Sequence, residues 1–216
     1  MAFTYIETTR REDYSMSNLS SYFYATLDLC DDSAYETKYT PLDFSYVYLK
    51  STGEGVGNGT GNVYAEEFVA ETQGWLCANS AAKTPVTFQF LYYADKKHYE
   101  ITPTTGTFKP GYYLANTKNM VGEDGGSVGA YRAGSTDTDR IQHLILPGAD
   151  PSTNIEPVNI INGTEIEIAW STKYGVRYWH AKTKTQLVNS NEWWCYIGVS
   201  KSIRSRIRIN LKDKAN

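Results

Sequence analysis

The sequence has no long apolar run, and this absence removes one large class of proteins. No stretch approaches the roughly 20 apolar residues that a membrane-spanning helix needs. Residues 1–13 also lack the charged start and the apolar segment of a secretion signal. We therefore expect a protein without a membrane span that is synthesised in the cytoplasm without a signal peptide.

Cysteine is scarce. Cys30, Cys77 and Cys195 are an odd number of thiols at wide spacing, so they provide neither paired Cys-x-x-Cys metal ligands nor a complete set of disulfides. A chain of 216 residues is long enough to bury a sizeable core without such crosslinks. We expect three small buried hydrophobic residues and no metal site.

Catalytic motifs are also lacking. The three histidines, His98, His143 and His180, lie in different predicted strands, and none belongs to a His-Glu-x-x-His or Gly-x-Ser-x-Gly motif. Glu165 and Glu167 are two residues apart on one predicted strand, roughly 7 Å from each other, which is tolerable for a glycosidase pair. Such pairs are also common on solvent-facing strands. The sequence therefore favours a non-enzymatic protein that needs no cofactor.

What the sequence does contain is alternation of apolar and polar residues at a period of two, which is typical of half-buried strands. Four of the five tryptophans lie between Thr164 and Lys212, where this pattern is clearest. Asn162-Gly163 predicts a tight hairpin between two strands. The strands expected from the pattern are residues 21–29, 43–50, 85–93, 98–102, 107–115, 140–146, 158–161, 164–170, 174–180, 193–199 and 203–211.

The segments between the expected strands are rich in glycine and contain little helical pattern. The glycine-rich residues 51–62 are expected to form a flexible hairpin or a surface loop, and residues 122–129 a second glycine-rich loop. Residues 63–74 favour a short helix, although a strand remains an alternative. The sequence thus predicts an all-β, antiparallel β-sandwich or jelly roll with at most one or two short helices, and a closed barrel is the second choice. One domain spans residues 1–216, with residues 1–20 as a candidate extended N-terminal arm.

Large aromatic side chains occupy both faces of the predicted strands near the C-terminus. In residues 174–180, Tyr178 and Trp179 are adjacent and therefore face opposite sides, as do Trp193 and Trp194. A single sheet has only one core face, so we expect one ring of each pair to be exposed or to meet a partner. The alternative is that a second sheet and a loop cover both faces within the monomer.

The last strand carries a stripe of positive charge. Residues 201–216 hold six basic residues and one acidic residue, a net charge of +5, which leaves −8 for residues 1–200 of a chain with −3 overall. Arg204, Arg206 and Arg208 share one face and would repel one another without an anionic neighbour. A cross-strand row of Glu165 and Glu167 is the expected neighbour. One short stripe without stacking aromatics predicts no specific nucleic-acid recognition.

These patterns together favour a structural or assembly protein that forms symmetric homo-oligomers, such as a coat, decoration, fibre or tail component of a virus or phage particle. The alternative is a carbohydrate-binding, lectin-like module that uses exposed rings. A pore-forming protein is less favoured because the sequence has no amphipathic insertion helix. The expected partners are copies of the chain itself, other assembly proteins or a glycan. The predicted binding or interface residues are Tyr174, Arg177, Tyr178, Trp179, Trp193, Trp194, Tyr196, Arg204, Arg206 and Arg208, with Glu165 and Glu167 as charge partners.

Overall fold

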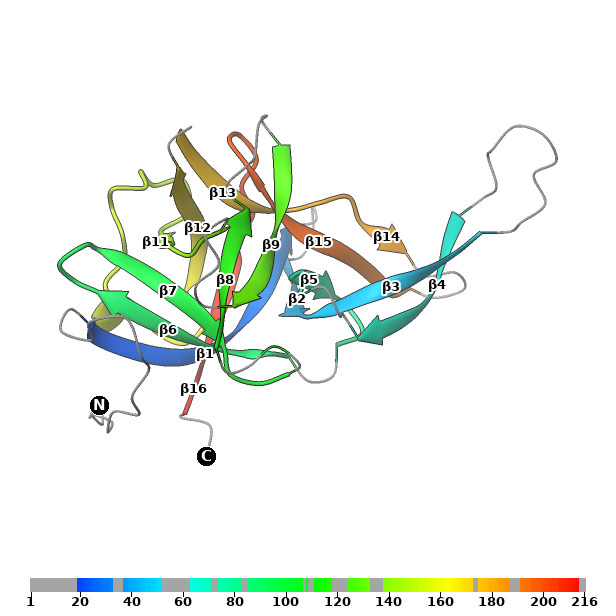
Figure 1. Ribbon diagram of the computed structural model, residues 1–216, viewed down its shortest axis with the longest axis horizontal. Helices are drawn as coiled ribbons and strands as arrows, with labels where there is room; N and C mark the ends of the chain where they lie inside the picture. Colours follow the sequence, from blue (N-terminus) through cyan, green and yellow to red (C-terminus); the bar gives the residue numbers. More distant parts are fainter. Residues whose placement is uncertain are drawn as a thin grey trace.

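The structure, a computed structural model, describes residues 19–32, 37–51, 63–70, 74–82, 85–106, 108, 111–117, 124–132, 138–172, 175–186 and 191–213. These residues form sixteen strands and one short 3-10 helix (Figure 1). The strands are β1 Leu19–Asp32, β2 Thr37–Asp43, β3 Ser45–Ser51, β4 Val63–Ala70, β5 Cys77–Asn79, β6 Thr87–Tyr93, β7 His98–Pro103, β8 Tyr112–Thr117, β9 Asp124–Arg132, β10 Thr138–Asp139, β11 His143–Ile145, β12 Glu165–Thr172, β13 Gly175–Ala181, β14 Thr185–Gln186, β15 Trp193–Ser200 and β16 Ile207–Lys212; the 3-10 helix η2 is Pro157–Asn159.

Fourteen strands join into one sheet, which we call the body. Its main path runs β10-β8-β9-β15-β13-β12-β16-β1-β2-β5, with β6, β7, β11 and β14 attached at its sides. Because β5 pairs both with β2 and with β15, seven strands form a closed circuit of antiparallel pairing. A sheet that closes in this way surrounds the side chains on its inner face. The prediction of an antiparallel all-β fold is confirmed, and its closure is barrel-like.

One apolar core fills this circuit. Every strand of the circuit contributes to a single cluster of buried residues, including Leu27 of β1, Trp179 of β13 and Ile197 of β15, all with no exposed surface. Phe88 and Phe90 of β6 join the same cluster. Burial of these side chains is the main stabilising contribution to a fold of this kind. The three cysteines are free and buried, as the sequence predicts.

Strands β3 and β4 form a separate two-stranded sheet, which we call the projecting hairpin. It extends away from the body, with β3 continuing the path of β2 beyond a bend at Phe44 (Figure 1). Its register runs from Ser45 opposite Ala70 to Ser51 opposite Val63. The helix favoured for residues 63–74 is therefore wrong over residues 63–70. The β-branched and aromatic residues of this segment fit a paired strand, and the partner strand overrides a weak helical propensity.

The strand expected at residues 158–161 is also absent. Pro157 has no N–H for a sheet ladder, and it begins a 3-10 turn in which the N–H of Ile160 donates to its carbonyl over 3.1 Å. The Asn162-Gly163 turn consequently joins no hairpin to β12. It lies against β16 instead, where the N–H of Gly163 donates to the carbonyl of Ile209 over 2.8 Å.

Two further expectations are wrong at their boundaries. Residues 124–129 of the expected glycine loop belong to β9, where Gly129 leaves room for the ring of Trp75, since a Cβ there would lie 3.0 Å from Trp75 Cε3. The last strand begins at Ile207, because residues 200–203 form a turn whose backbone N–H groups donate to the Ser200 hydroxyl.

The remaining expectations concern segments at the edge of the described residues. Of the candidate N-terminal arm, Leu19 and Ser20 belong to β1, and residues 1–18 lie outside the described residues. Residues 52–62 of the first glycine loop also lie outside them. Among the described residues, no helix has the length and apolar character to cross a membrane.

Candidate functional site

The aromatic residues of β13 are buried on both faces of the sheet. Trp179 has no exposed surface and lies in the main core, where its Nε1 donates to Gln142 Oε1 over 3.3 Å. Tyr178, on the opposite face, is only 6% exposed and packs with Ile145 and Ala169 in a second small cluster. Arg177 is also buried. The expectation that one of these rings is exposed or meets a partner is therefore wrong for this strand.

A loop within the monomer covers the second face of β13. Residues 146–154 fold over it, and Ala149 packs against the cluster that contains Tyr178. The loop is held by the N–H of Gly148, which donates to Glu167 Oε1 over 3.1 Å. Asp150 accepts hydrogen bonds from Ser152, which lower the pKa of its carboxyl group. The alternative in which the monomer covers both faces holds here.

The second tryptophan pair differs from the first. Trp194 is buried and meets the ring of Tyr196 edge-on, with 4.3 Å between centroids. Trp193 is half-buried, and the ammonium of Lys184 lies 4.2 Å from the centroid of its ring while also pairing with Asp31. A cation on the ring face is a favourable contact. It also means that this face of Trp193 is not an open platform for a sugar.

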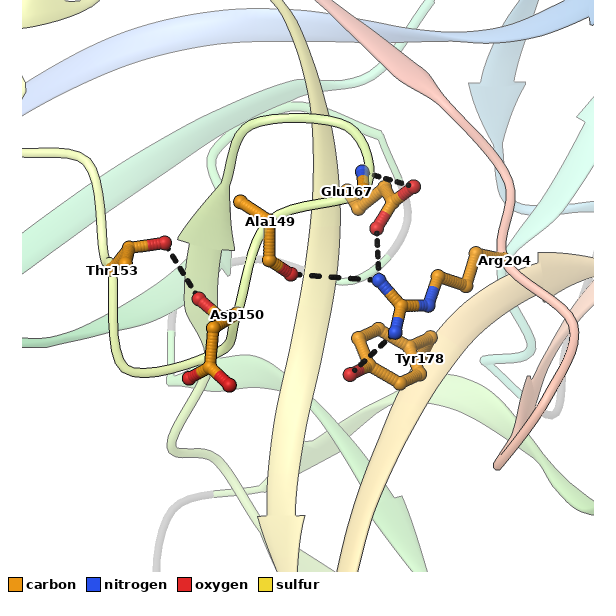
Figure 2. Close-up of polar contacts among 7 residues, drawn as sticks. Ala149, Asp150, Thr153, Glu167, Tyr178 and Arg204 are labelled. Carbon is orange, nitrogen blue, oxygen red and sulfur yellow. Dashed lines mark hydrogen bonds and ion pairs between the residues drawn. The ribbon is translucent and has the colours of Figure 1, made fainter.

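Arg204 is held by a carboxylate and an aromatic ring at once. Its Nη1 lies 3.1 Å from Glu167 Oε2, and its Nη2 donates to the Tyr178 hydroxyl over 3.0 Å (Figure 2). The guanidinium carbon lies 3.8 Å from the centroid of the same ring. Charge-assisted hydrogen bonds and cation–π contacts of this kind are stronger when the carboxylate is shielded, and Glu167 is only 6% exposed.

Arg206 and Arg208 repeat this arrangement around Glu165. Arg206 Nη1 lies 2.5 Å from Glu165 Oε2, and the hydroxyl of Tyr39 donates to Glu165 Oε1 over 3.0 Å. Arg208 stands opposite Glu165 in the sheet register, and its guanidinium lies 4.3 Å from the Tyr39 ring. The hydrogen bond to Glu165 raises the pKa of Tyr39. The expected row of two glutamates does face the arginines.

This pairing changes what the arginine stripe can do. Glu167 binds Arg204 and the N–H of Gly148, and Glu165 binds Arg206 and the hydroxyl of Tyr39, so two of the three arginines are paired with a carboxylate of the same subunit. Such a network contributes modestly to stability and leaves little free charge to attract a second acidic surface. Of the residues predicted for the interface, Tyr174 lies outside the described residues, and Tyr196 is half-buried.

The histidines do not form a common site. His98 and His143 are near each other, and His98 stacks on Tyr93 with 5.0 Å between ring centroids. Burial lowers the pKa of His98, and the neighbouring His143 and Lys96 lower it further. His180 lies on β13, with its Nδ1 3.0 Å from the carbonyl oxygen of Ala181. Within the described part of the chain, no three His, Cys, Asp or Glu side chains are grouped as metal ligands.

Lys182 is a residue that the sequence analysis missed. Its side chain crosses over Gly198, where a Cβ would lie 2.5 Å from Lys182 Cε, and its Nζ donates to Ser127 Oγ over 3.0 Å. Burial lowers the pKa of Lys182. The side chain thus links β13 to β9 across β15. No sequence pattern points to it, because the contact depends on which strands become neighbours.

The pairing of β3 with β4 in the projecting hairpin was not predicted from the sequence either. The residues next to the two strands, which we call the root of the hairpin, are anchored in the body. On the β3 side, Phe44 is 7% exposed and packs edge-on against Phe88 and Phe108, at centroid distances of 6.3 and 5.1 Å. Asp43 accepts hydrogen bonds from Cys77 Sγ and Asn79 Nδ2, both over 3.3 Å. These contacts fix where the hairpin leaves the body.

The β4 side of the root is equally well packed. The N–H of Ala130 donates to the carbonyl of Gly74 over 2.7 Å, and the N–H of Leu76 donates to Val128 over 2.9 Å. Gly74 has a φ of +82°, which glycine adopts without strain. The glycine-rich segment 51–62 between two apolar stretches was the available sequence signal for this hairpin.

Comparison with family models, with curated proteins and with solved structures finds no match to this chain.

Proposed function

We propose that the protein is a non-enzymatic structural protein that assembles with copies of itself, and that the projecting hairpin is its assembly element. The proposal extends to the class of proteins that build virus or phage particles, as coat, decoration, fibre or tail components. That extension is supported by composition alone: a tyrosine-rich, glycine-rich all-β chain without a recognisable catalytic motif.

The observation that carries the proposal is the isolation of β3 and β4. A two-stranded hairpin is marginally stable in water unless a third strand or another element packs on it. Here the two strands pair only with each other among the described strands, while their root is fixed in the core. At about 3.3 Å per residue, the seven residues of β3 reach roughly 23 Å from that root. A second subunit would supply the missing packing.

The carbohydrate-binding alternative has less support. A sugar platform needs an exposed aromatic face. Trp179 and Trp194 are buried, and the Lys184 ammonium lies over the ring of Trp193. The hypothesis that oligomers form through the arginine stripe is weakened in the same way, because Arg204 and Arg206 are paired with glutamates within the subunit.

Sedimentation velocity of the full chain at tens of micromolar tests the proposal. We expect an oligomer, and we expect a monomer when residues 46–69 are replaced by Asn-Gly, which closes a two-residue hairpin between Ser45 and Ala70, since these face each other in the register. The shortened chain should keep the thermal midpoint of the body within a few degrees. A full-length chain that sediments as a monomer would contradict the proposal.

A further inference from the structure

The two edges of the projecting hairpin differ in how well they can accept another strand. β4 contains a bulge: Tyr48 stands opposite Glu67 and Leu49 opposite Ala65, so Glu66 is an extra residue without a partner. Bulges and charged residues are devices that keep sheet edges from pairing with other chains. β4 has both, because the bulged residue and its neighbour are glutamates. Its outer edge is therefore poorly suited to strand addition.

β3 has no bulge, and its one charged residue, Lys50, stands next to the end of the strand. Its seven residues are Ser-Tyr-Val-Tyr-Leu-Lys-Ser, with one basic residue, no acidic residue and no bulge. A strand at the edge of a sheet presents unpaired N–H and C=O groups along its length. Valine, leucine and tyrosine at these positions favour extended, paired backbone. Of the two hairpin strands, β3 is the one whose outer edge remains regular.

We infer that β3 is the docking edge of the projecting hairpin and that its occupant is β3 of a second copy of this chain, paired antiparallel about Tyr48 to make a four-stranded sheet. This inference rests on the proposed assembly function and specifies its partner, its strand and its register. Strand addition of this type obtains its affinity from main-chain hydrogen bonds and its specificity from the side chains at alternate positions.

The sequence of β3 is complementary to itself in this register. Pairing about Tyr48 sets Tyr48 opposite its own copy, Val47 opposite Leu49, and Tyr46 opposite Lys50. Aromatic pairs and apolar pairs at opposed positions stabilise antiparallel strands, and an ammonium opposite a tyrosine is favourable. The same operation about Glu67 of β4 would set this glutamate opposite its own copy, and like charges at opposed positions are destabilising. The two-fold symmetry also closes the assembly as a dimer.

Cysteine crosslinking tests the register in the full-length chain. Tyr48→Cys places a thiol on the two-fold axis, and mild oxidation should convert most of the protein to a covalent dimer, because opposed Cβ atoms in antiparallel strands lie about 5 Å apart. The matched control is Glu67→Cys, which stands opposite Tyr48 on β4. Its thiols would be separated by three strand spacings, roughly 14 Å, and should not crosslink. The native cysteines are buried and do not interfere.

Charge substitution at the same position gives an independent test. Tyr48→Lys stands opposite Glu67 in the register of its own hairpin, and it sets two ammonium groups against each other across the proposed dimer axis. We expect its dimer dissociation constant to rise at least tenfold, as should that of Tyr48→Glu. An equimolar mixture of the two variants should restore dimers, because each axis then carries one charge of each sign.

The outcomes separate this inference from the function on which it rests. A wild-type chain that is monomeric contradicts the assembly function itself. A wild-type oligomer in which Glu67→Cys crosslinks and Tyr48→Cys does not shows docking through β4, which overturns the inference alone. An oligomer in which neither variant crosslinks and mixing restores nothing shows docking of the hairpin elsewhere, for example on an edge of the body, and overturns it as well.

Discussion

The body and the projecting hairpin differ in how far their side chains are covered and their strands are paired within one subunit. In the body, closure of the sheet and the loop at residues 146–154 cover aromatic residues on both faces of β13, and Arg204 and Arg206 pair with glutamates within the subunit. In the hairpin, two strands share a single ladder and continue outward from a well-packed root. The body thus covers these rings within the subunit, whereas β3 and β4 pair only with each other among the described strands.

This difference moves the expected interface from the aromatic residues and arginines of the body to the projecting hairpin. Rings and charges that the sequence pattern places on an outer face become buried or paired when strands distant in the chain become neighbours. A ladder of only two strands cannot be completed in this way, because each strand has one partner and one open edge. The experiments below test whether stability belongs to the body and association to the hairpin.

The largest expected effect is that of Trp179→Ala. The side chain has no exposed surface and lies in the core of the closed circuit, so its removal should lower the free energy of unfolding by about 3–5 kcal/mol. Urea unfolding followed by circular dichroism measures the loss. Oligomer size below the unfolding transition should not change, since the residue is far inside the body.

The matched control is Trp193→Ala, at the half-buried ring under Lys184. We expect no more than about half of the Trp179 effect, because part of the ring is already in contact with water. Equal losses for the two variants would show that the second tryptophan is as much a core residue as the first.

An intermediate effect is expected for Gly129→Val, at the root of the hairpin. A Cβ at this position would meet the ring of Trp75 at 3.0 Å and the carbonyl of Gly74 at 3.1 Å. Overpacking of this kind typically costs about 1–3 kcal/mol, and Gly129→Ala should cost less than Gly129→Val. Hydrogen exchange at Leu76, whose N–H donates to Val128, should accelerate. Unchanged exchange at Leu76 in the valine variant would mean that the root does not depend on this contact.

Much of the fold could be predicted from local pattern, because a period of two is set by residues that are close in sequence. The strands β1, β6, β7, β12, β13 and β15 were predicted near their observed positions for this reason. The pairing of Glu165 and Glu167 with the arginine stripe could also be predicted, since both sets alternate and three like charges in a row need an opposing row.

The failures have a common physical cause. Burial of Tyr178 depends on a loop that folds back over its strand, and burial of Trp179 depends on closure of the circuit. Neither event leaves a local pattern in the sequence. Residues 63–70 form a strand because they pair with β3. Gly129 belongs to a strand and not to a loop, and the residue that needs its lack of a side chain, Trp75, is more than fifty residues away in the chain. Long-range contacts of this kind override local propensity.

A smaller effect is expected for Glu167→Gln, which removes the carboxylate that binds Arg204 while keeping the shape of the side chain. Because Glu167 is buried but Arg204 is one-third exposed, the loss should be about 1 kcal/mol. A double-mutant cycle with Arg204→Met measures how much of it belongs to the pair. Glu165→Gln, in the more exposed unit, should lose less.

These charge variants also test the division of roles directly. If association belongs to the hairpin, the dimer dissociation constant of Glu167→Gln and of Arg204→Met should match that of the wild type. If either variant associates more weakly while its free energy of unfolding is unchanged, the interface includes the arginine stripe.

The smallest effect concerns His98, which lies in β7 of the body. Burial lowers its pKa in the folded state, so the unfolded chain takes up a proton first as the pH falls through the ordinary value of about 6.5. The unfolded state then binds more protons, and stability declines between this pH and the lower folded pKa. The thermal midpoint should fall over this window in the wild type, and the fall should be shallower in His98→Gln. The chain shortened at residues 46–69 should show the same dependence of the thermal midpoint on pH as the wild type, because His98 belongs to the body. If this pH dependence disappears when the hairpin is removed, the titrating group lies outside the body and the two regions are not independent.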